Sequence, residues 1–432
     1  MKHLAPDYIY TSQGLQSNQI VSISDEGYIC ALSERGPASE ITEVLPGIAL
    51  LPGFVNAHSH AFQRALRGRT HRARSAHDTF WTWRQAMYTE VQRLNPDSLY
   101  QISLQTYREM LAAGYTSVGE FHYVHHQPGG QPYERENIMA EAVLQAGRDA
   151  GIRVVLLLTA YARGDFSHAP DETQRRFCDA SLDAYLSRAE ALRTAGTALG
   201  IAPHSVRAVP QEWLHALAEY SLKHGLPFHI HADEQLAEIE QCWQAENCTP
   251  IELLERNGAL GPRTTIIHAT HASQEEIALL EQRGASVCVC PTTEGDLGDG
   301  IAPYAELVAA HIPLCIGSDS NTRLDALEEL RWAEYSACMR YQRRRILVSD
   351  ELAASGSLLL AYGTQAGATA LGLQTGIIAP GMAADFVAIN LHALSLANWT
   401  ADDFLDQLFF GTSREIFVQT WVQGNKVWSA TA

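Results

Sequence analysis

The segment Leu51-Pro-Gly-Phe-Val-Asn-Ala-His-Ser-His60 is an apolar run that ends in two histidines. On an extended backbone, residues i and i+2 point to the same side, so His58 and His60 can bind one ion together. A lone His-x-His pair is a weak signal, because two surface histidines in a loop have the same pattern. Its significance therefore depends on whether later parts of the chain supply further ligands.

Seven further apolar runs come after the first, and helix-like segments such as 96–113 and 274–283 lie between them. Strands that alternate with helices indicate a parallel sheet with right-handed crossovers. Eight strands over this length predict a closed (β/α)8 barrel of the α/β class. The candidate strands are 49–58, 116–123, 153–161, 199–206, 227–232, 264–269, 286–290 and 313–317.

Reactive side chains stand at the C-terminal end of nearly every candidate strand. Barrel enzymes build their sites at this rim, whereas a doubly wound open sheet would concentrate them at one switch point. The distribution therefore favours the barrel. The residues include His58, His60, Glu120, Tyr123, His204, Arg207, His231, Glu234, His268, Glu294 and Asp319.

The two ends of the chain have a different pattern, in which short β-like stretches alternate with turns. We expect residues 1–48 and 376–432 to form one small β-sandwich domain beside a barrel built from residues 49–375. Near the C-terminus, Gly424-Asn425 lies between two β-prone runs and predicts the turn of a hairpin.

Composition narrows the function classes. The chain has 432 residues, of which 46% are apolar, so it can bury a large core. Its net charge of −18 argues against nucleic acid as a partner. The same charge repels anionic substrates, which would need arginines placed locally. Arginine is abundant for that purpose, since only Lys2, Lys223 and Lys426 are lysines among 31 basic residues.

The chain has no recognisable leader, no apolar run long enough to span a membrane and no dense cysteine framework. We therefore expect a cytoplasmic protein without a membrane partner. Cys288 and Cys290 alternate with valines, as on one face of a buried strand, and we interpret them as core residues.

The strand ends carry enough ligands for a metal ion. His58, His60, His231, His268 and Asp319 are candidates, and three histidines with one carboxylate make a zinc site that leaves room for water. Glu234 follows His231 by three residues, so it could reach a water molecule without binding the ion.

This arrangement resembles the amidohydrolase superfamily, and the resemblance covers essentially the full chain, including Gly381-Met-Ala-Ala-Asp385. Many members bridge two metals with a carboxylated lysine after strand four. Here that strand ends in Pro203-His-Ser-Val-Arg207, without a lysine. The resemblance therefore implies the one-metal class, with the His-x-x-Glu pattern of His231 and Glu234.

Several local motifs are similar to those of the formimidoylglutamate deiminases, a family of histidine degradation. The motifs are His58-Ser-His-Ala-Phe-Gln-Arg64, Phe80-Trp-Thr-Trp-Arg84, Glu120-Phe-His-Tyr-Val-His-His126, His204-Ser-Val-Arg-Ala208, Thr293-Glu294 with Leu297-Gly-Asp-Gly300, and Glu328-Glu-Leu-Arg-Trp332. The resemblance implies a set of roles: metal ligands His58, His60, His231 and Asp319; catalytic groups Glu234, His268 and Asp319; and substrate contacts Gln63, Arg84, Tyr123, His204 and Arg207.

The activity implied is hydrolysis of the formimino C–N bond of N-formimino-L-glutamate to N-formyl-L-glutamate and ammonia. The implied cofactor is one divalent ion, Zn²⁺ or else Fe²⁺ or Mn²⁺, and the implied assembly is a homodimer. The residues agree with a dicarboxylate substrate, because guanidinium groups suit carboxylates and Arg84 and Arg207 are expected on the same rim.

Two alternatives remain open. The chain could be another one-metal aminohydrolase that acts on a nucleobase or a guanidino compound, or a catalytically silent amidohydrolase-like scaffold.

Overall fold

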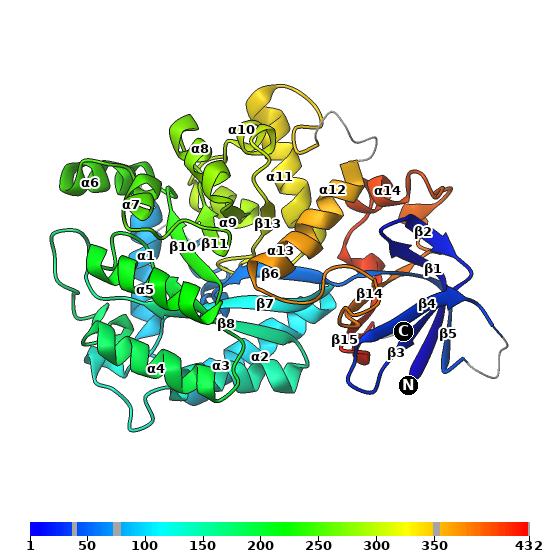
Figure 1. Ribbon diagram of the computed structural model, residues 1–432, viewed down its shortest axis with the longest axis horizontal. Coiled ribbons are helices and arrows are strands. Elements are labelled where there is room, and N and C mark those ends of the chain that lie inside the picture. Colours follow the sequence, from blue (N-terminus) through cyan, green and yellow to red (C-terminus); the bar gives the residue numbers. More distant parts are fainter. Residues whose placement is uncertain (37–40, 72–78, 349–354, 431–432) are drawn as a thin grey trace.

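The computed structural model describes residues 1–36, 41–71, 79–348 and 355–430. A barrel of parallel strands lies beside a mixed sheet formed by both ends of the chain (Figure 1). The predicted fold class, a (β/α)8 barrel with a small β unit built from both termini, is confirmed.

The barrel strands follow one another in sequence order, and each pairs in parallel with the next. A parallel bridge between Ser59 and Asp319 joins the first strand to the last at their C-terminal ends. Nearly all residues of the eight barrel strands are buried, as expected where helices cover the outer face of a parallel sheet. The strands are β6 (Phe54–Ser59), β7 (Tyr115–His122), β8 (Arg153–Ala160), β9 (Leu199–Pro203), β10 (Phe228–Ala232), β11 (Thr264–His268), β12 (Ser286–Val289) and β13 (Leu314–Ile316).

Helices surround the barrel, and their ends follow local sequence signals (Figure 1). In α8 (Gln274–Arg283), for example, Ser273 and Glu276 form a capping box, and Gly284 ends the helix at φ 69°. The helices expected at 96–113 and 274–283 are confirmed. The first of these is α2 (Pro96–Ala112). The others around the barrel are α1 (Phe80–Val91), α3 (Ile138–Ala150), α4 (Leu182–Thr194), α5 (Gln211–His224), α6 (Leu236–Glu246), α7 (Pro250–Arg256), α9 (Pro291–Leu297), α10 (Tyr304–Ala309) and α11 (Ala326–Tyr341).

The terminal sheet has the strand order β16-β15-β14-β5-β1-β3-β4, with β2 paired to β1. Its strands are β1 (Lys2–Thr11), β2 (Gly14–Ser17), β3 (Gln19–Ile23), β4 (Ile29–Glu34), β5 (Glu43–Pro52), β14 (Phe386–Asn390), β15 (Phe417–Val422) and β16 (Asn425–Ser429). Between barrel and sheet the chain forms α12 (Ser355–Ala361), a π-helical turn η5 (Tyr362–Ala366) and α13 (Gly367–Ala370), and α14 (Phe404–Gly411) precedes β15.

The run expected as one strand at 49–58 is two strands, so that prediction was wrong. Its first part belongs to β5, which pairs with β1 and β14, and its second part is β6. The break falls at Gly53, where a Cβ would lie 2.2 Å from Cγ2 of Thr116. Only glycine allows the chain to pass this close to β7 on its way from one sheet into the other.

The C-terminal hairpin is confirmed, but its turn lies one residue earlier than predicted. Val422 pairs with Asn425, so Gln423 and Gly424 form the turn, with φ of 48° and 67°. Two-residue hairpin turns of this type require positive φ at both central residues. Asn425 is therefore the first residue of β16 rather than part of the turn.

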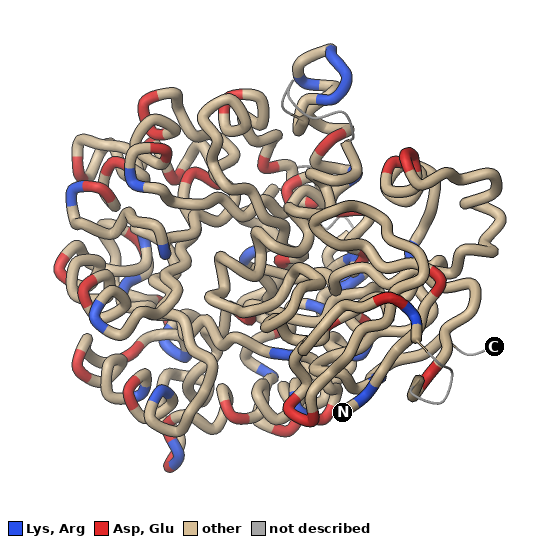
Figure 2. Tube along the Cα trace, turned by 45° about the vertical axis from the view of Figure 1, so that its right-hand side comes forward, with Lys and Arg blue, Asp and Glu red and all other residues tan. Residues whose placement is uncertain are grey.

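Figure 2 shows acidic positions spread over the outer helices and loops of the barrel, with basic positions interspersed among them. Among the described residues, every helix is too short or too polar to cross a membrane.

Asp385 connects the terminal sheet to the barrel. Its carboxylate forms an ion pair with Arg153 at the start of β8 and accepts hydrogen bonds from Thr375 Oγ1 and from the Gln423 N–H, both at 2.8 Å. The Asp385 side chain is fully buried, so water cannot replace these partners.

We predict that Asp385→Ala lowers the free energy of unfolding by roughly 3 kcal/mol, because it leaves the largely buried Arg153 guanidinium without its counter-charge. Urea denaturation followed by circular dichroism measures the change. The exposed Asp402 provides a control, and Asp402→Ala should leave the midpoint unchanged. Equal midpoints for both variants would contradict the role given to Asp385.

Candidate metal centre and active site

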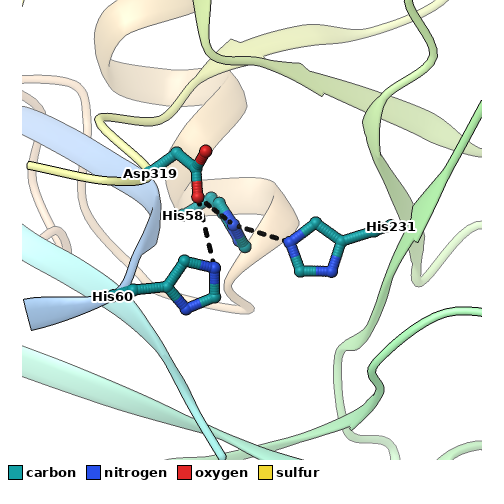
Figure 3. A group of neighbouring side chains, drawn as sticks. All are labelled: His58, His60, His231 and Asp319. Carbon is teal, nitrogen blue, oxygen red and sulfur yellow. Dashed lines mark hydrogen bonds and ion pairs between the residues drawn. The ribbon is translucent and has the colours of Figure 1, made fainter. Parts of the chain in front are cut away.

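Four side chains from three strands meet at the C-terminal mouth of the barrel (Figure 3). His58 and His60 lie at the end of β6, His231 lies in β10, and Asp319 follows β13. Asp319 Oδ1 lies 3.2 Å from Nε2 of both His58 and His60. Nε2 of His231 lies 3.1 Å from Nε2 of His58. The four ligand-type atoms are all within 4.8 Å of one another.

Hydrogen bonds at Nδ1 of two imidazole rings determine which ring nitrogen faces this centre. His60 Nδ1 donates to the Phe121 carbonyl and His231 Nδ1 donates to the His204 carbonyl, each at 2.8 Å. A neutral imidazole that donates through Nδ1 has a lone pair at Nε2. The Nε2 lone pairs of His60 and His231 therefore point into the centre.

The donor set fits a divalent metal ion. Imidazole nitrogens packed this closely repel one another unless a proton or a cation lies between them. Although burial alone would raise the pKa of Asp319, hydrogen bonds with His58 and His60 hold that pKa well below its usual range. Three neutral imidazoles and one carboxylate are a set that zinc takes, with a position left for water.

A buried polar network fixes the two strand ends that carry these ligands. Asn56 Nδ2 donates to Ser318 Oγ at 2.6 Å, and Ser318 Oγ donates to Asn321 Oδ1 at 2.6 Å. Asn321 Nδ2 donates to Ser59 Oγ at 3.1 Å, and Ser59 Oγ donates to Glu120 Oε2 at 3.0 Å. The network runs from β6 to β13 and back, so the His58–His60 segment and Asp319 are held relative to each other.

All the predicted site residues except His58 line one cavity at this mouth. They are His60, Gln63, Arg84, Tyr123, His204, Arg207, His231, Glu234, His268 and Asp319. The sequence had not assigned the rest of the lining, which is Phe80, Trp83, Met87, Tyr88 and Leu297. Helix α1 supplies four of these five residues together with Arg84, so it forms one wall.

Glu234 and His268 face each other in the cavity, with Oε1 of the glutamate 3.7 Å from Nε2 of the histidine. Burial raises the pKa of Glu234 to about 7, although the nearby His268 opposes the rise. The other ring nitrogen of His268 lies 3.3 Å from Glu294 Oε1, which fixes the ring. His268 has φ of 75°, a strained conformation for a residue with a side chain and one that concentrates at functional sites.

The two cysteines interpreted as core residues are both fully buried. Both belong to one apolar cluster with Ala57, Ile267, Cys315 and Ala370. Cys290 lies next to the pair formed by His268 and Glu294, with ligand-type atoms of all three within 4.8 Å of one another.

Both cavity arginines are held through Nε. Arg84 Nε donates to Tyr88 Oη at 2.7 Å, and Arg207 Nε donates to Glu238 Oε1 at 3.1 Å. Among the described residues, no acceptor contacts the terminal nitrogens of either guanidinium. Those nitrogens are the pair that binds a carboxylate in bidentate fashion. Each guanidinium group is thus held at its Nε atom, and its two terminal nitrogens are available to bind a ligand.

A sequence model described as the amidohydrolase family matches residues 49–427. The chain belongs to the amidohydrolase family. This amidohydrolase is 38% identical over 411 residues to formimidoylglutamate deiminase of Pseudomonas aeruginosa, a match that covers 94% of this chain and 90% of the relative. It is 30% identical over 408 residues to 8-oxoguanine deaminase of the same organism. That match covers 90% of this chain and 85% of the relative.

Solved structures agree with the fold of this amidohydrolase. The crystal structure of an amidohydrolase from Brucella melitensis superposes with a TM-score of 0.91 at 32% identity and covers 99% of this chain and 94% of that one. An adenosine deaminase from Xanthomonas campestris with bound zinc gives a TM-score of 0.80 at 23% identity, with 98% and 92% covered. At that identity the second comparison supports the fold alone.

The sequence motifs indicate no role for Ser318, Asn321, Glu238 or Tyr88. Ser318 and Asn321 do have a signal in the sequence, because both lie within two residues of the candidate ligand Asp319. Glu238 has no such signal, because only the folded chain brings it to Arg207. Tyr88 lies four residues after Arg84, one turn along α1, so helical spacing alone places the two side chains together.

Close packing at Gly317 yields a test of the metal centre in this amidohydrolase. A Cβ at Gly317 would lie 2.7 Å from Cβ and 2.9 Å from the carbonyl oxygen of His58. We predict that Gly317→Ala displaces His58 and weakens metal binding by about tenfold or more, as measured by metal analysis after dialysis against a competing chelator. Gly261→Ala is the control, since nothing lies within 4 Å of its Cβ position. Full metal retention in Gly317→Ala would refute the proposed packing constraint.

Proposed function

We propose that this amidohydrolase is a deiminase that hydrolyses N-formimino-L-glutamate to N-formyl-L-glutamate and ammonia. The observation that carries the proposal is the composition of one cavity. It combines a three-histidine, one-aspartate metal set, a buried glutamate and two arginines whose terminal nitrogens meet no acceptor among the described residues. The 38% identical relative named formimidoylglutamate deiminase supports the same substrate.

The substrate has two carboxylates, which matches the two available guanidinium groups. In a protein of net charge −18, such a dianion binds only where positive charge is placed locally. We propose Arg84 and Arg207 as the carboxylate-binding residues. Gln63, Tyr123 and His204 would contribute further hydrogen bonds, and Gln63 Nε2 already donates to Tyr123 Oη at 3.0 Å.

In the proposed mechanism His58, His60, His231 and Asp319 hold the ion. A divalent ion held by this set would lower the pKa of water and so supply hydroxide near neutral pH. Glu234 accepts the proton that the water loses, a task that suits a carboxyl group with a pKa of about 7. His268 and Asp319 orient the attacking oxygen toward the formimino carbon.

Attack forms a carbon–oxygen bond, and the electron pair of the C=N bond moves to the terminal nitrogen. Glu234 then returns its proton to that nitrogen, which becomes an amine. The second proton that ammonia needs comes from the new hydroxyl group on the carbon and passes to the amine through Glu234, after which the C–N bond breaks and ammonia leaves. The remaining carbon becomes the carbonyl of N-formyl-L-glutamate. Glu234 thus acts first as base and then as acid.

We propose zinc as the ion, because the set of ligands is typical of zinc sites. Fe²⁺ and Mn²⁺ are the alternatives that metal analysis of the purified protein would reveal. Analysis that finds no ion under any metal supplementation would instead favour a catalytically silent scaffold. A homodimer and a cytoplasmic location are also proposed, to be tested by light scattering and by cell fractionation.

Ammonia release tests the substrate. N-formimino-L-glutamate is compared with guanine, adenosine and cytosine on the same metal-loaded protein, and we expect turnover only for the first. Turnover of a nucleobase or nucleoside in place of formiminoglutamate would overturn the proposal and favour the alternative one-metal aminohydrolase.

We predict that Glu234→Gln retains the ion but lowers kcat by about 10²- to 10⁴-fold, because the amide cannot accept and return a proton. Metal analysis and steady-state kinetics on the same preparation separate the two effects. An unchanged kcat would remove Glu234 from proton transfer, and a loss of metal would mean that Glu234 supports the ion instead.

Arg84 provides a test of dicarboxylate binding. We predict that Arg84→Ala raises KM for N-formimino-L-glutamate by about 10- to 100-fold, since a hydrogen-bonded charge pair with the substrate is lost. The variant should also lose the preference of the wild type for N-formimino-L-glutamate over N-formimino-glycine, which lacks the second carboxylate. Arg93→Ala, at an exposed arginine just beyond the same helix, should change neither value.

A further inference from the structure

Glu238 is a buried acid that contacts two proposed active-site residues without lining the cavity itself. It lies in the first turn of α6, and its side chain has no exposed surface. Its Oε1 accepts the hydrogen bond from Arg207 Nε at 3.1 Å, and its Oε2 accepts one from the backbone N–H of Glu234 at 3.3 Å. Both carboxylate oxygens are therefore engaged, each by a different neighbour.

The local backbone explains how one side chain reaches both donors. Asp233 directly follows β10 and has φ of 56°, which turns the chain sharply between the strand and α6. The turn places the Glu234 N–H over the first turn of α6, four residues before Glu238. Arg207 comes from the loop after β9, the neighbouring strand. Glu238 thus joins the ends of two adjacent strands from outside the cavity.

The charges show why a carboxylate is needed there. The Arg207 side chain is only 6% exposed, and a buried guanidinium without a counter-charge is strongly unfavourable. Other buried acids lie close by, but among the described residues Glu238 is the carboxylate that forms an ion pair with Arg207. Because the pair uses the Nε edge, the terminal nitrogens of Arg207 remain available to a ligand.

We propose that Glu238 is a positioning residue that sets the substrate-binding Arg207 and the proton-transferring Glu234 at a fixed distance from each other. This inference rests on the proposed function for the roles of those two residues. Substrate bound to Arg207 would then have its reacting carbon next to the Glu234 carboxylate, without a rearrangement of either side chain. Small misplacements of such groups are costly to turnover.

The isosteric variant Glu238→Gln tests the proposal. An amide has one acceptor oxygen and turns its NH₂ group toward the second donor, so one of the two contacts must break. We expect kcat/KM to fall by roughly 100-fold, with KM raised and kcat lowered, while the metal content stays near wild type. The melting temperature should fall as well, because Arg207 loses its counter-charge, so the kinetics are measured well below it. Glu240→Gln is the matched control: the same substitution at an exposed position on the same helix, with wild-type kinetics expected.

A double-mutant cycle with Arg207→Ala separates positioning from a general structural role. If Glu238 acts on KM through Arg207, then adding Glu238→Gln to Arg207→Ala should raise KM no further, whereas the loss in kcat should persist through Glu234. Unchanged kinetics in Glu238→Gln, or fully additive effects on KM, would overturn the proposal.

If Glu238→Gln fails to fold, Glu238→Asp takes its place. It keeps the buried charge, but it is one methylene too short to reach both donors, so the same loss is expected and wild-type kinetics would again refute the role. Wild-type turnover is measured first. If formiminoglutamate gives no ammonia, the proposed function fails, and the cycle is repeated with whichever amidine or nucleobase the wild type hydrolyses.

Discussion

Two backbone hydrogen bonds hold the site together. The His60 N–H donates to the Asp319 carbonyl at 2.9 Å, and the Asp319 N–H donates to the His58 carbonyl at 3.0 Å. They join the first barrel strand to the last and complete the ring. Three of the four candidate metal ligands belong to these two strand ends. The ligands therefore come together only when the first and last barrel strands pair. The network through Asn56, Ser318 and Asn321 reinforces the same junction with side chains.

Much of this arrangement could be predicted because it depends on periodicity and on spacing. Strand runs, helical periods and reactive residues at strand ends are local patterns, and they led to the barrel and to the two histidines of β6. The break at Gly53 was missed because apolar residues lie on both sides of Pro52-Gly53, although this dipeptide is itself a turn signal. Only the contact with Thr116, distant along the chain, shows that the stretch serves two sheets.

The same limit applies to the site. Many residues that line the cavity could be named from motifs, whereas Met87 and Tyr88 of the lining and the supporting residue Glu238 could not. Tyr88 supports Arg84 and Glu238 supports Arg207 through contacts that depend on side-chain direction in the folded state. The acidic composition indicated that an anionic substrate would need local arginines, but a net charge of −18 does not show that two guanidinium groups line one pocket.

The passage of the chain from β5 into β6 links two parts of the molecule. The strand that leaves the terminal sheet at Pro52 becomes, after one glycine, the strand that carries His58 and His60. Opening of that sheet would pull directly on two candidate metal ligands, and an ion that fixes those ligands would in turn resist the opening. Metal occupancy and the folding of the two chain ends are therefore thermodynamically coupled, although no residue of the terminal sheet belongs to the proposed ligand set.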